Sequence, residues 1–148
     1  MNWPNKFKVK KIILLRLAGG LGNQLFQLGF ALDYASRNKC KLLVSKAHIG
    51  SYDTVHEYVL ESIFEIDSII TSNHIIDFIL RLRLPRLFPI LSRYVCFVSD
   101  SNMQKSLKIN FKDSKVVILD GYFQKFYKNV DYSYLKSKIK ERHCKNSN

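Results

Sequence analysis

The chain has 148 residues, of which 47% are hydrophobic, and a formal net charge of +12 at pH 7. This length allows one buried core. The hydrophobic content and the lack of low-complexity tracts or internal repeats argue against a disordered protein and a solenoid. The charge favours an anionic partner, such as a pyrophosphate, acidic lipid head groups or nucleic acid. A lysine-rich solvated surface explains the same charge equally well.

Residues 1–10 predict a basic, flexible leader in which Pro4 discourages a helix, and residues 11–145 are expected to form a single domain. The leader has no apolar run typical of a signal peptide or membrane anchor. Charged side chains interrupt the hydrophobic stretch 75–98, which argues against an ordinary membrane-spanning helix. The three cysteines are widely spaced and odd in number, which predicts free thiols in the cytoplasm and no metal site.

Residues 11–38 predict a strand, a glycine-rich turn and a helix. The apolar run 11–17 is too short for a stable helix, and from Asn23 the apolar and small residues fall at helical spacing up to Asn38. The run 41–44 predicts a second strand, which pairs in parallel with the first through a right-handed crossover. A strand, a glycine turn and a helix start form a site for phosphate, because the first N–H groups of the helix are free.

The rest of the chain predicts further α/β elements. After a loop at 46–53, residues 55–64 fit either a short strand or a helical turn. A helical region begins at Asp67 or Ser68, or else Ser72 and Asn73 cap a helix that runs to Leu84. Residues 94–98 and 116–119 predict strands, 100–113 a polar connection, and 132–142 a basic helix. The elements together predict an α/β fold, a Rossmann-like parallel sheet with flanking helices.

The glycine turn does not fit the common nucleotide fingerprints. Gly20 and Gly22 match the first two glycines of the dinucleotide motif, but Leu25 stands in place of the third. The strand 41–44 ends in Ser45, which offers no carboxylate for a ribose. No Gly-Lys-Ser/Thr follows the turn. These features argue against a nicotinamide or flavin site and exclude a Walker-type loop.

The segment 19–27, Gly-Gly-Leu-Gly-Asn-Gln-Leu-Phe-Gln, resembles the amino-terminal signature of the alpha-1,2-fucosyltransferases, glycosyltransferase family 11. The segment 119–124, Leu-Asp-Gly-Tyr-Phe-Gln, resembles the family's Gly-Tyr-Phe-Gln segment. Residues 58–66 resemble a third region more loosely, with one extra residue before Phe64. The resemblance covers nearly the whole chain but only the first half of the family.

This resemblance implies the amino-terminal domain of a GT-B-like glycosyltransferase, with the second, donor-binding domain absent. Such an enzyme transfers fucose from GDP-fucose to a galactoside in surface-glycan or O-antigen synthesis, without a metal or another cofactor. The family's His-x-Arg-Arg-x-Asp segment is missing from the sequence. The expectation is therefore a truncated enzyme. Its partners would be a nucleotide sugar, a galactoside acceptor and a separately encoded carboxyl-terminal half.

The resemblance also implies which residues line the site. The donor side of the cleft would comprise Gly19, Gly20, Gly22, Asn23 and Gln24. The Asn23 amide can donate to phosphate or sugar oxygens, unless it serves only as the N-cap of the helix. No catalytic residue is assigned, because Asp33 and Asp120 are singled out by position alone.

A wall of the cleft would comprise Gly121, Tyr122, Phe123 and Gln124. Their aromatic rings suit stacking on a sugar or guanine, although aromatic residues after a buried strand more often pack in the core.

Two other readings stay open. One is a non-catalytic basic module that binds nucleic acid or an anionic membrane surface. Nucleic acid is the weaker partner, because no helix-turn-helix, zinc-finger or RNA-binding signature is present. A cytoplasmic chain could also contact the membrane peripherally through its basic residues. The other reading is a folded remnant that has lost its function.

Overall fold

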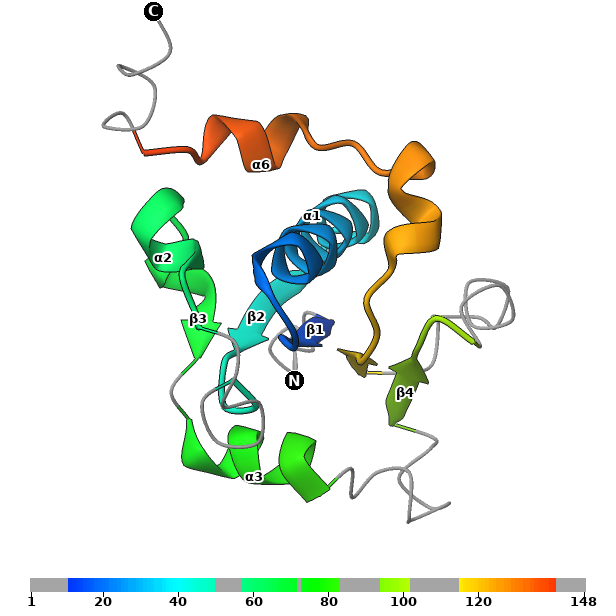
Figure 1. Cartoon of the computed structure of the whole chain (residues 1–148). Coiled ribbons are helices and arrows are strands. Elements are labelled where there is room, and N and C mark those ends of the chain that lie inside the picture. Colours follow the sequence, from blue (N-terminus) through cyan, green and yellow to red (C-terminus); the bar gives the residue numbers. More distant parts are fainter. Residues whose placement is uncertain (1–10, 50–56, 72, 83–93, 102–114, 141–148) are drawn as a thin grey trace, which may run out of the picture.

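The computed structural model describes residues 11–49, 57–71, 73–82, 94–101 and 115–140. Five parallel strands form one sheet in the order β3-β2-β1-β5-β4. This arrangement confirms the predicted Rossmann-like parallel sheet with flanking helices (Figure 1). The strands are β1 (Ile12–Arg16), β2 (Lys41–Ser45), β3 (Ile70–Thr71), β4 (Val95–Val98) and β5 (Val116–Leu119).

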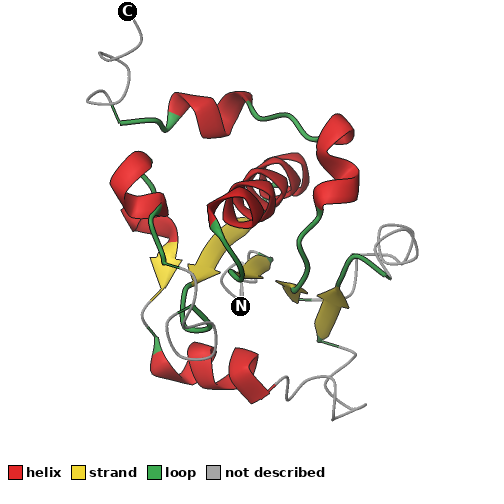
Figure 2. Cartoon of the chain, viewed as in Figure 1, coloured by secondary structure: helices red, strands yellow, loops and turns green. Residues whose placement is uncertain are grey.

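Helices lie on both sides of this sheet. Figure 1 shows α1 beside α6 on one side and α3 on the opposite side, and Figure 2 distinguishes helices, strands and loops in the same view. The helical elements are α1 (Leu21–Asn38), α2 (Leu60–Ile63), the 3₁₀ turn η1 (Asp67–Ile69), α3 (His74–Leu82), the 3₁₀ turn η3 (Gln124–Asn129) and α6 (Ser133–Ser137).

The two faces of β1 supply two separate cores. Ile13 and Leu15 are fully buried in the larger cluster, which includes Leu28 of α1. Leu14 points the other way and packs with Ile118 of β5 and Leu80 of α3. Strand residues alternate between faces, so a strand that is buried on both sides must be apolar throughout. That requirement explains the unbroken apolar run before Arg16.

Helix α1 begins at Leu21, so the predicted start at Asn23 is wrong by two residues. Gly20 is the N-cap, with an extended backbone, and its carbonyl accepts the first helical hydrogen bond from the Gln24 N–H at 3.0 Å. Asn23 therefore lies inside the first turn and does not cap the helix. The predicted end is confirmed at Asn38, after which Lys39 adopts a left-handed conformation.

The region after α2 holds an edge strand that the sequence pattern missed. The helical region expected from Asp67 or Ser68 is only the short turn η1, and β3 then pairs with β2. The alternative start is confirmed, because the Asn73 side-chain oxygen accepts the N–H groups of Ile75 and Ile76 at 2.9 and 3.2 Å. Residues 50–56, 72 and 83–93 lie outside the described residues, as does most of the predicted polar connection 100–113.

The predicted helix 132–142 is wrong at residues 138–140, which follow the end of α6 at Ser137; residues 141–142 lie outside the described residues. The chain leaves α6 and runs alongside the segment after α2, where Ile139 forms an antiparallel bridge with Phe64. The Glu65 N–H donates to the Lys138 carbonyl at 2.7 Å, and the Lys140 N–H donates to the Ile63 carbonyl at 2.9 Å. These bonds use backbone groups that a longer helix would have kept for itself.

Candidate functional site

The topology indicates where a ligand fits. From β1 the chain moves outward to β2 and β3, then crosses to the far edge and returns inward from β4 to β5. The order therefore reverses between β1 and β5. In open parallel sheets, ligands bind at such a reversal, outside the carboxyl ends of the strands. Both segments that resemble the fucosyltransferase family begin at this edge.

Two buried glutamines hold the glycine turn in shape. Gly19 has a φ of +76°, a conformation that favours glycine. The Gln24 side chain, fully buried, donates from its amide nitrogen to the Gly19 carbonyl at 2.8 Å and to the Glu57 carbonyl at 2.9 Å. The Gln27 side chain accepts from the Ala18 N–H at 3.1 Å. Gln24 thus shapes the turn from inside and offers its amide hydrogens to the backbone rather than to a cleft.

The two segments that resemble the family meet in space. The Gln124 side chain donates from Nε2 to Oδ1 of Asn23 at 2.5 Å. Tyr122 lies next to the glycine turn, since a Cβ built on Gly19 would be 3.2 Å from its ring. Four of the predicted site residues therefore lie together, and they come from positions about one hundred residues apart in the chain.

Phe123 is the predicted wall residue that the structure places elsewhere. Its side chain is only 1% exposed and belongs to the core cluster. Its ring stacks on Phe30 of α1 with centroids 4.4 Å apart and planes 12° apart. Tyr122 and Gly121, in contrast, line a cavity at the sheet edge. Two consecutive aromatic residues thus face opposite ways, Tyr122 into the cavity and Phe123 into the core.

Asp100, which follows β4, fixes the backbone of this segment. Its two carboxylate oxygens accept the N–H groups of Tyr122 at 2.8 Å and Phe123 at 2.7 Å. Phe123 has a φ of +57°, a left-handed conformation that is rare outside glycine. A Cβ on Gly121 would lie 2.7 Å from the Asp100 carboxylate, so this close approach requires glycine. The sequence gives no signal for this role of Asp100.

A charged cluster occupies the reversal point between β1 and β5. Arg16, at the end of β1, contacts the Asp120 carboxylate at 2.5 Å, and the two side chains are 13% and 8% exposed. The other arm of Arg16 lies 3.0 Å from Nδ1 of His48. A guanidinium only donates, so Nδ1 of His48 accepts and the ring proton resides on Nε2.

This cluster lines a cavity of about 290 Å³ together with Gln27, Asp100 and Tyr122. Among the described residues that line it, one guanidinium faces two carboxylates, so this lining lacks the excess positive charge that holds a pyrophosphate. Sequence position singles out Asp120 but does not link it to Arg16. The strand register brings the two side chains together, because Leu15 pairs with Leu119, and Arg16 and Asp120 are the residues that follow this pair.

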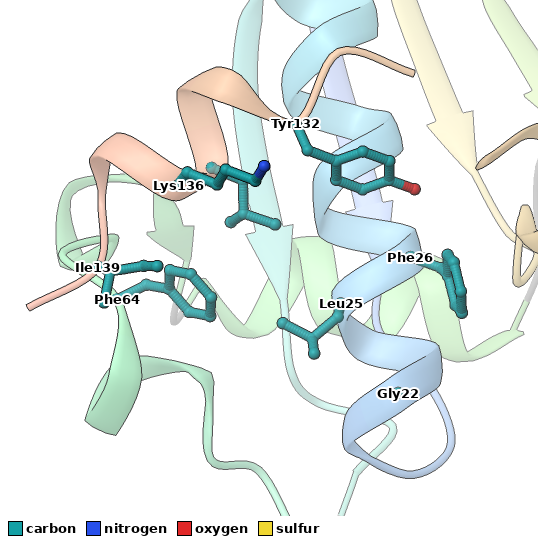
Figure 3. Close-up of a pocket in the computed structure, with 8 residues that line it drawn as sticks. Gly22, Leu25, Phe26, Phe64, Tyr132, Lys136 and Ile139 are labelled. Atoms are coloured by element: carbon teal, nitrogen blue, oxygen red, sulfur yellow. The ribbon is translucent and has the colours of Figure 1, made fainter. Parts of the chain in front are cut away.

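A second hollow is an apolar groove between α1 and α6, with a volume of about 340 Å³. Figure 3 shows Leu25 facing it from α1, and Phe64 and Ile139 from the two segments that form the antiparallel bridge. Gly22 lies at the first turn of α1, at one end of the groove. The walls of the groove are apolar, and its one charged group among the described residues, the Lys136 ammonium, lies at the rim, which separates the groove chemically from the cavity at Arg16.

Burial shifts several titratable groups. It raises the pKa of the Tyr34 and Tyr58 phenols far above the usual range, and it raises the pKa of the Cys40 and Cys96 thiols. These groups are neutral at pH 7, and both thiols are poor nucleophiles. The pKa of Asp131 is lowered, chiefly because its carboxylate accepts the backbone N–H of Ser133.

Within the described ranges, no three His, Cys, Asp or Glu side chains gather to hold a metal ion. None of the helices in that part of the chain is long and apolar enough to cross a membrane. Comparisons with protein-family models, with curated proteins and with solved structures find no match for this chain.

Gly22 and Gly29 lie on the same helix but differ in the space around them. It is exposed in the first turn of α1, and a Cβ built there meets nothing within 4 Å. We expect Gly22→Ala to raise the free energy of unfolding in urea, by up to about 1 kcal/mol, because alanine favours the helix. The matched variant Gly29→Ala is expected to lower it by about 1–3 kcal/mol, since its Cβ would lie 2.2 Å from the Tyr132 ring. A loss of stability in Gly22→Ala would contradict this description of the turn.

Proposed function

We propose that the chain forms the amino-terminal half of an alpha-1,2-fucosyltransferase-type enzyme with a GT-B-like architecture. The observation that carries this proposal is the hydrogen bond between Asn23 and Gln124. It joins the two segments that resemble this family, at the sheet edge where parallel α/β folds bind ligands. A merely local similarity in either segment would not require the two to meet.

The start of α1 suits the diphosphate of a nucleotide sugar. Gly20 caps the helix without a side chain, and Gly22 leaves the first turn uncovered. The first N–H groups of an 18-residue helix, together with its dipole, attract an anion. The Asn23 amide nitrogen lies over Gly19, since a Cβ on Gly19 would be 2.7 Å from it. Its carbonyl oxygen is held by Gln124, which leaves the NH₂ group as a donor to a ligand oxygen.

In the proposed reaction, the oxygen of a galactoside hydroxyl bonds to C1 of fucose as the bond from C1 to the GDP oxygen breaks. GDP leaves with the bonding electrons, and the hydroxyl proton passes to solvent, since no base is assigned. Negative charge grows on the diphosphate and requires cationic groups as well as backbone donors. Arg16 is paired with Asp120 and His48, so it is a poor source of that charge. We assign the cationic role to the family's His-x-Arg-Arg-x-Asp segment, which a separately encoded half would supply. The chain by itself would then bind GDP but turn over little.

Calorimetric titration with GDP and GDP-fucose tests this proposal, with ATP and a short DNA duplex as comparison ligands at two salt concentrations. We expect selective binding of GDP, weakened about tenfold by Asn23→Ala, which removes a hydrogen bond to a charged ligand. The control Asn38→Ala removes an asparagine at the other end of α1, where the side chain bonds only the Tyr34 carbonyl. It should leave GDP binding unchanged.

Equal, salt-sensitive binding of every anion would overturn the proposal, as would no binding of GDP. A further variant, Gln124→Ala, leaves the Asn23 amide in place but removes its tether. A smaller loss of GDP binding than in Asn23→Ala is expected, because the amide can still donate after reorientation. Loss of binding in Asn38→Ala would also count against the assignment to the glycine turn.

A further inference from the structure

The apolar groove between α1 and α6 has the chemistry of a site for a hydrocarbon chain. Its lining includes Leu25 and Phe26 from α1, and Phe64 and Ile139 from the two bridged segments (Figure 3). Leu135 of α6 lines it as well. These side chains leave about 340 Å³ of unfilled space. Water in an apolar hollow lacks hydrogen-bond partners, so a hydrocarbon guest is the favourable occupant.

One charged residue takes part in this groove, among the described residues that line it. Lys136 contributes its aliphatic stem to the wall, and Figure 3 shows its ammonium nitrogen at the rim. An ammonium at the mouth of a hydrocarbon site matches the acidic head of an amphiphile. A neutral apolar partner would leave that charge without a counterpart.

Exposed tyrosines occur with lysines near the groove: Tyr127 lies against the groove residue Phe26, whereas Tyr134 of α6 lines a separate hollow with Asp33 and Asp131. Lys128 lies over the Tyr127 ring at 5.8 Å from its centroid, and Lys138 lies over the Tyr134 ring at 5.4 Å. Both tyrosines are 50% exposed. Aromatic and lysine side chains of this kind are typical of surfaces that rest in the head-group layer of a membrane.

The charge beside the groove is positive, as a surface that binds acidic head groups requires. Residues 124–140 contain five lysines and one acidic residue, Asp131. Across the groove, Glu65 is the acidic neighbour of Phe64, and its backbone N–H bonds the Lys138 carbonyl. The excess of positive charge therefore lies on the α6 side, where it complements an anionic surface.

We propose that this surface docks the chain on an anionic membrane, with the acyl chain of an anionic phospholipid in the groove and its phosphate at Lys136. Charge alone would favour any anion. The groove favours an anionic phospholipid, because it buries a hydrocarbon chain next to the phosphate. A nucleic acid would satisfy the lysines but leave the groove empty.

Flotation of the full chain with phosphatidylglycerol vesicles and with phosphatidylcholine vesicles tests this inference. We expect binding to the anionic vesicles only, with affinity reduced by on the order of tenfold or more in Lys136→Glu, which removes one positive charge and adds a negative one. The control is Lys115→Glu, which makes the same change of charge at the amino-terminal edge of the sheet, where Lys115 lies over the Tyr94 ring. Charges beyond about 10 Å are largely screened at 0.1 M salt, so this control should keep most of the binding.

Leu25→Gln separates the groove from diffuse electrostatics, since it keeps the net charge and makes the groove polar. We expect a several-fold loss of vesicle binding in this variant, measured at a temperature at which its melting curve shows it to be folded, because Leu25 also packs against the core. Unchanged binding in Leu25→Gln, equal losses in Lys136→Glu and Lys115→Glu, or tighter binding of a DNA duplex than of vesicles would each overturn the proposal. GDP binding can fail while vesicle binding stands, so the two proposals are tested independently.

Discussion

Replacing Phe123 by alanine is expected to lower the free energy of unfolding by about 3–5 kcal/mol. The ring is almost completely buried, and it stacks on Phe30 between α1 and the end of β5. Alanine would leave a cavity of ring size. It would also keep the left-handed backbone at this position, so no strain is relieved in exchange. Urea unfolding monitored by circular dichroism measures the loss.

The neighbouring variant Tyr122→Ala is the matched control, because Tyr122 is aromatic too but 45% exposed. It should change the free energy of unfolding by no more than about 0.5 kcal/mol, as surface substitutions usually do. If Tyr122 stacks on a ligand at the sheet edge, the same variant will weaken GDP or sugar binding. Equal destabilisation by the two variants would contradict the assignment of one residue to the core and the other to the cleft.

Removing the Asp100 carboxylate is the second change with a large expected effect. Asp100→Ala deletes two charge-assisted hydrogen bonds to the N–H groups of Tyr122 and Phe123. Because these bonds are only partly shielded from water, we expect a loss of about 2–3 kcal/mol in the free energy of unfolding. We also expect weaker GDP binding, since the segment that carries Gln124 to Asn23 loses its anchor.

Two further variants serve as controls for Asp100→Ala. Ser101→Ala alters the exposed residue next to Asp100 and should be nearly neutral. Asp100→Asn keeps one carbonyl oxygen as an acceptor and should recover part of the lost stability. An asparagine variant no better than alanine would show that the carboxylate acts through its charge and not through the two bonds.

Much of the sheet was predictable, because each central strand is an apolar run bounded by turn residues. β5 matches its predicted range, and β1, β2 and β4 match within one or two residues at each end. β3 was missed, since two paired residues at a sheet edge leave no pattern of their own. The end of α6 was missed as well, because helical spacing continues past Ser137 while the backbone bonds go to the segment 63–65.

The site was predictable only where residue types carry information. The glycines indicated the turn, and the structure places Asn23, Gln124 and Tyr122 beside it. Gln24 and Phe123 matched the same resemblance, yet they face inward. Their burial depends on which side of a helix or loop each occupies, and that is decided by tertiary packing rather than by local sequence.

The pairing of β1 with β5 determines how late this fold can be completed. β1 is central in the sheet, but its partner on one side begins at Val116, about one hundred residues later. Until that stretch leaves the ribosome, β1 presents an unpaired apolar edge, which is a template for aggregation. We therefore expect nascent chains that end before Val116 to require a chaperone. Chains that reach Lys140 can close the sheet and then pack α6 against α1.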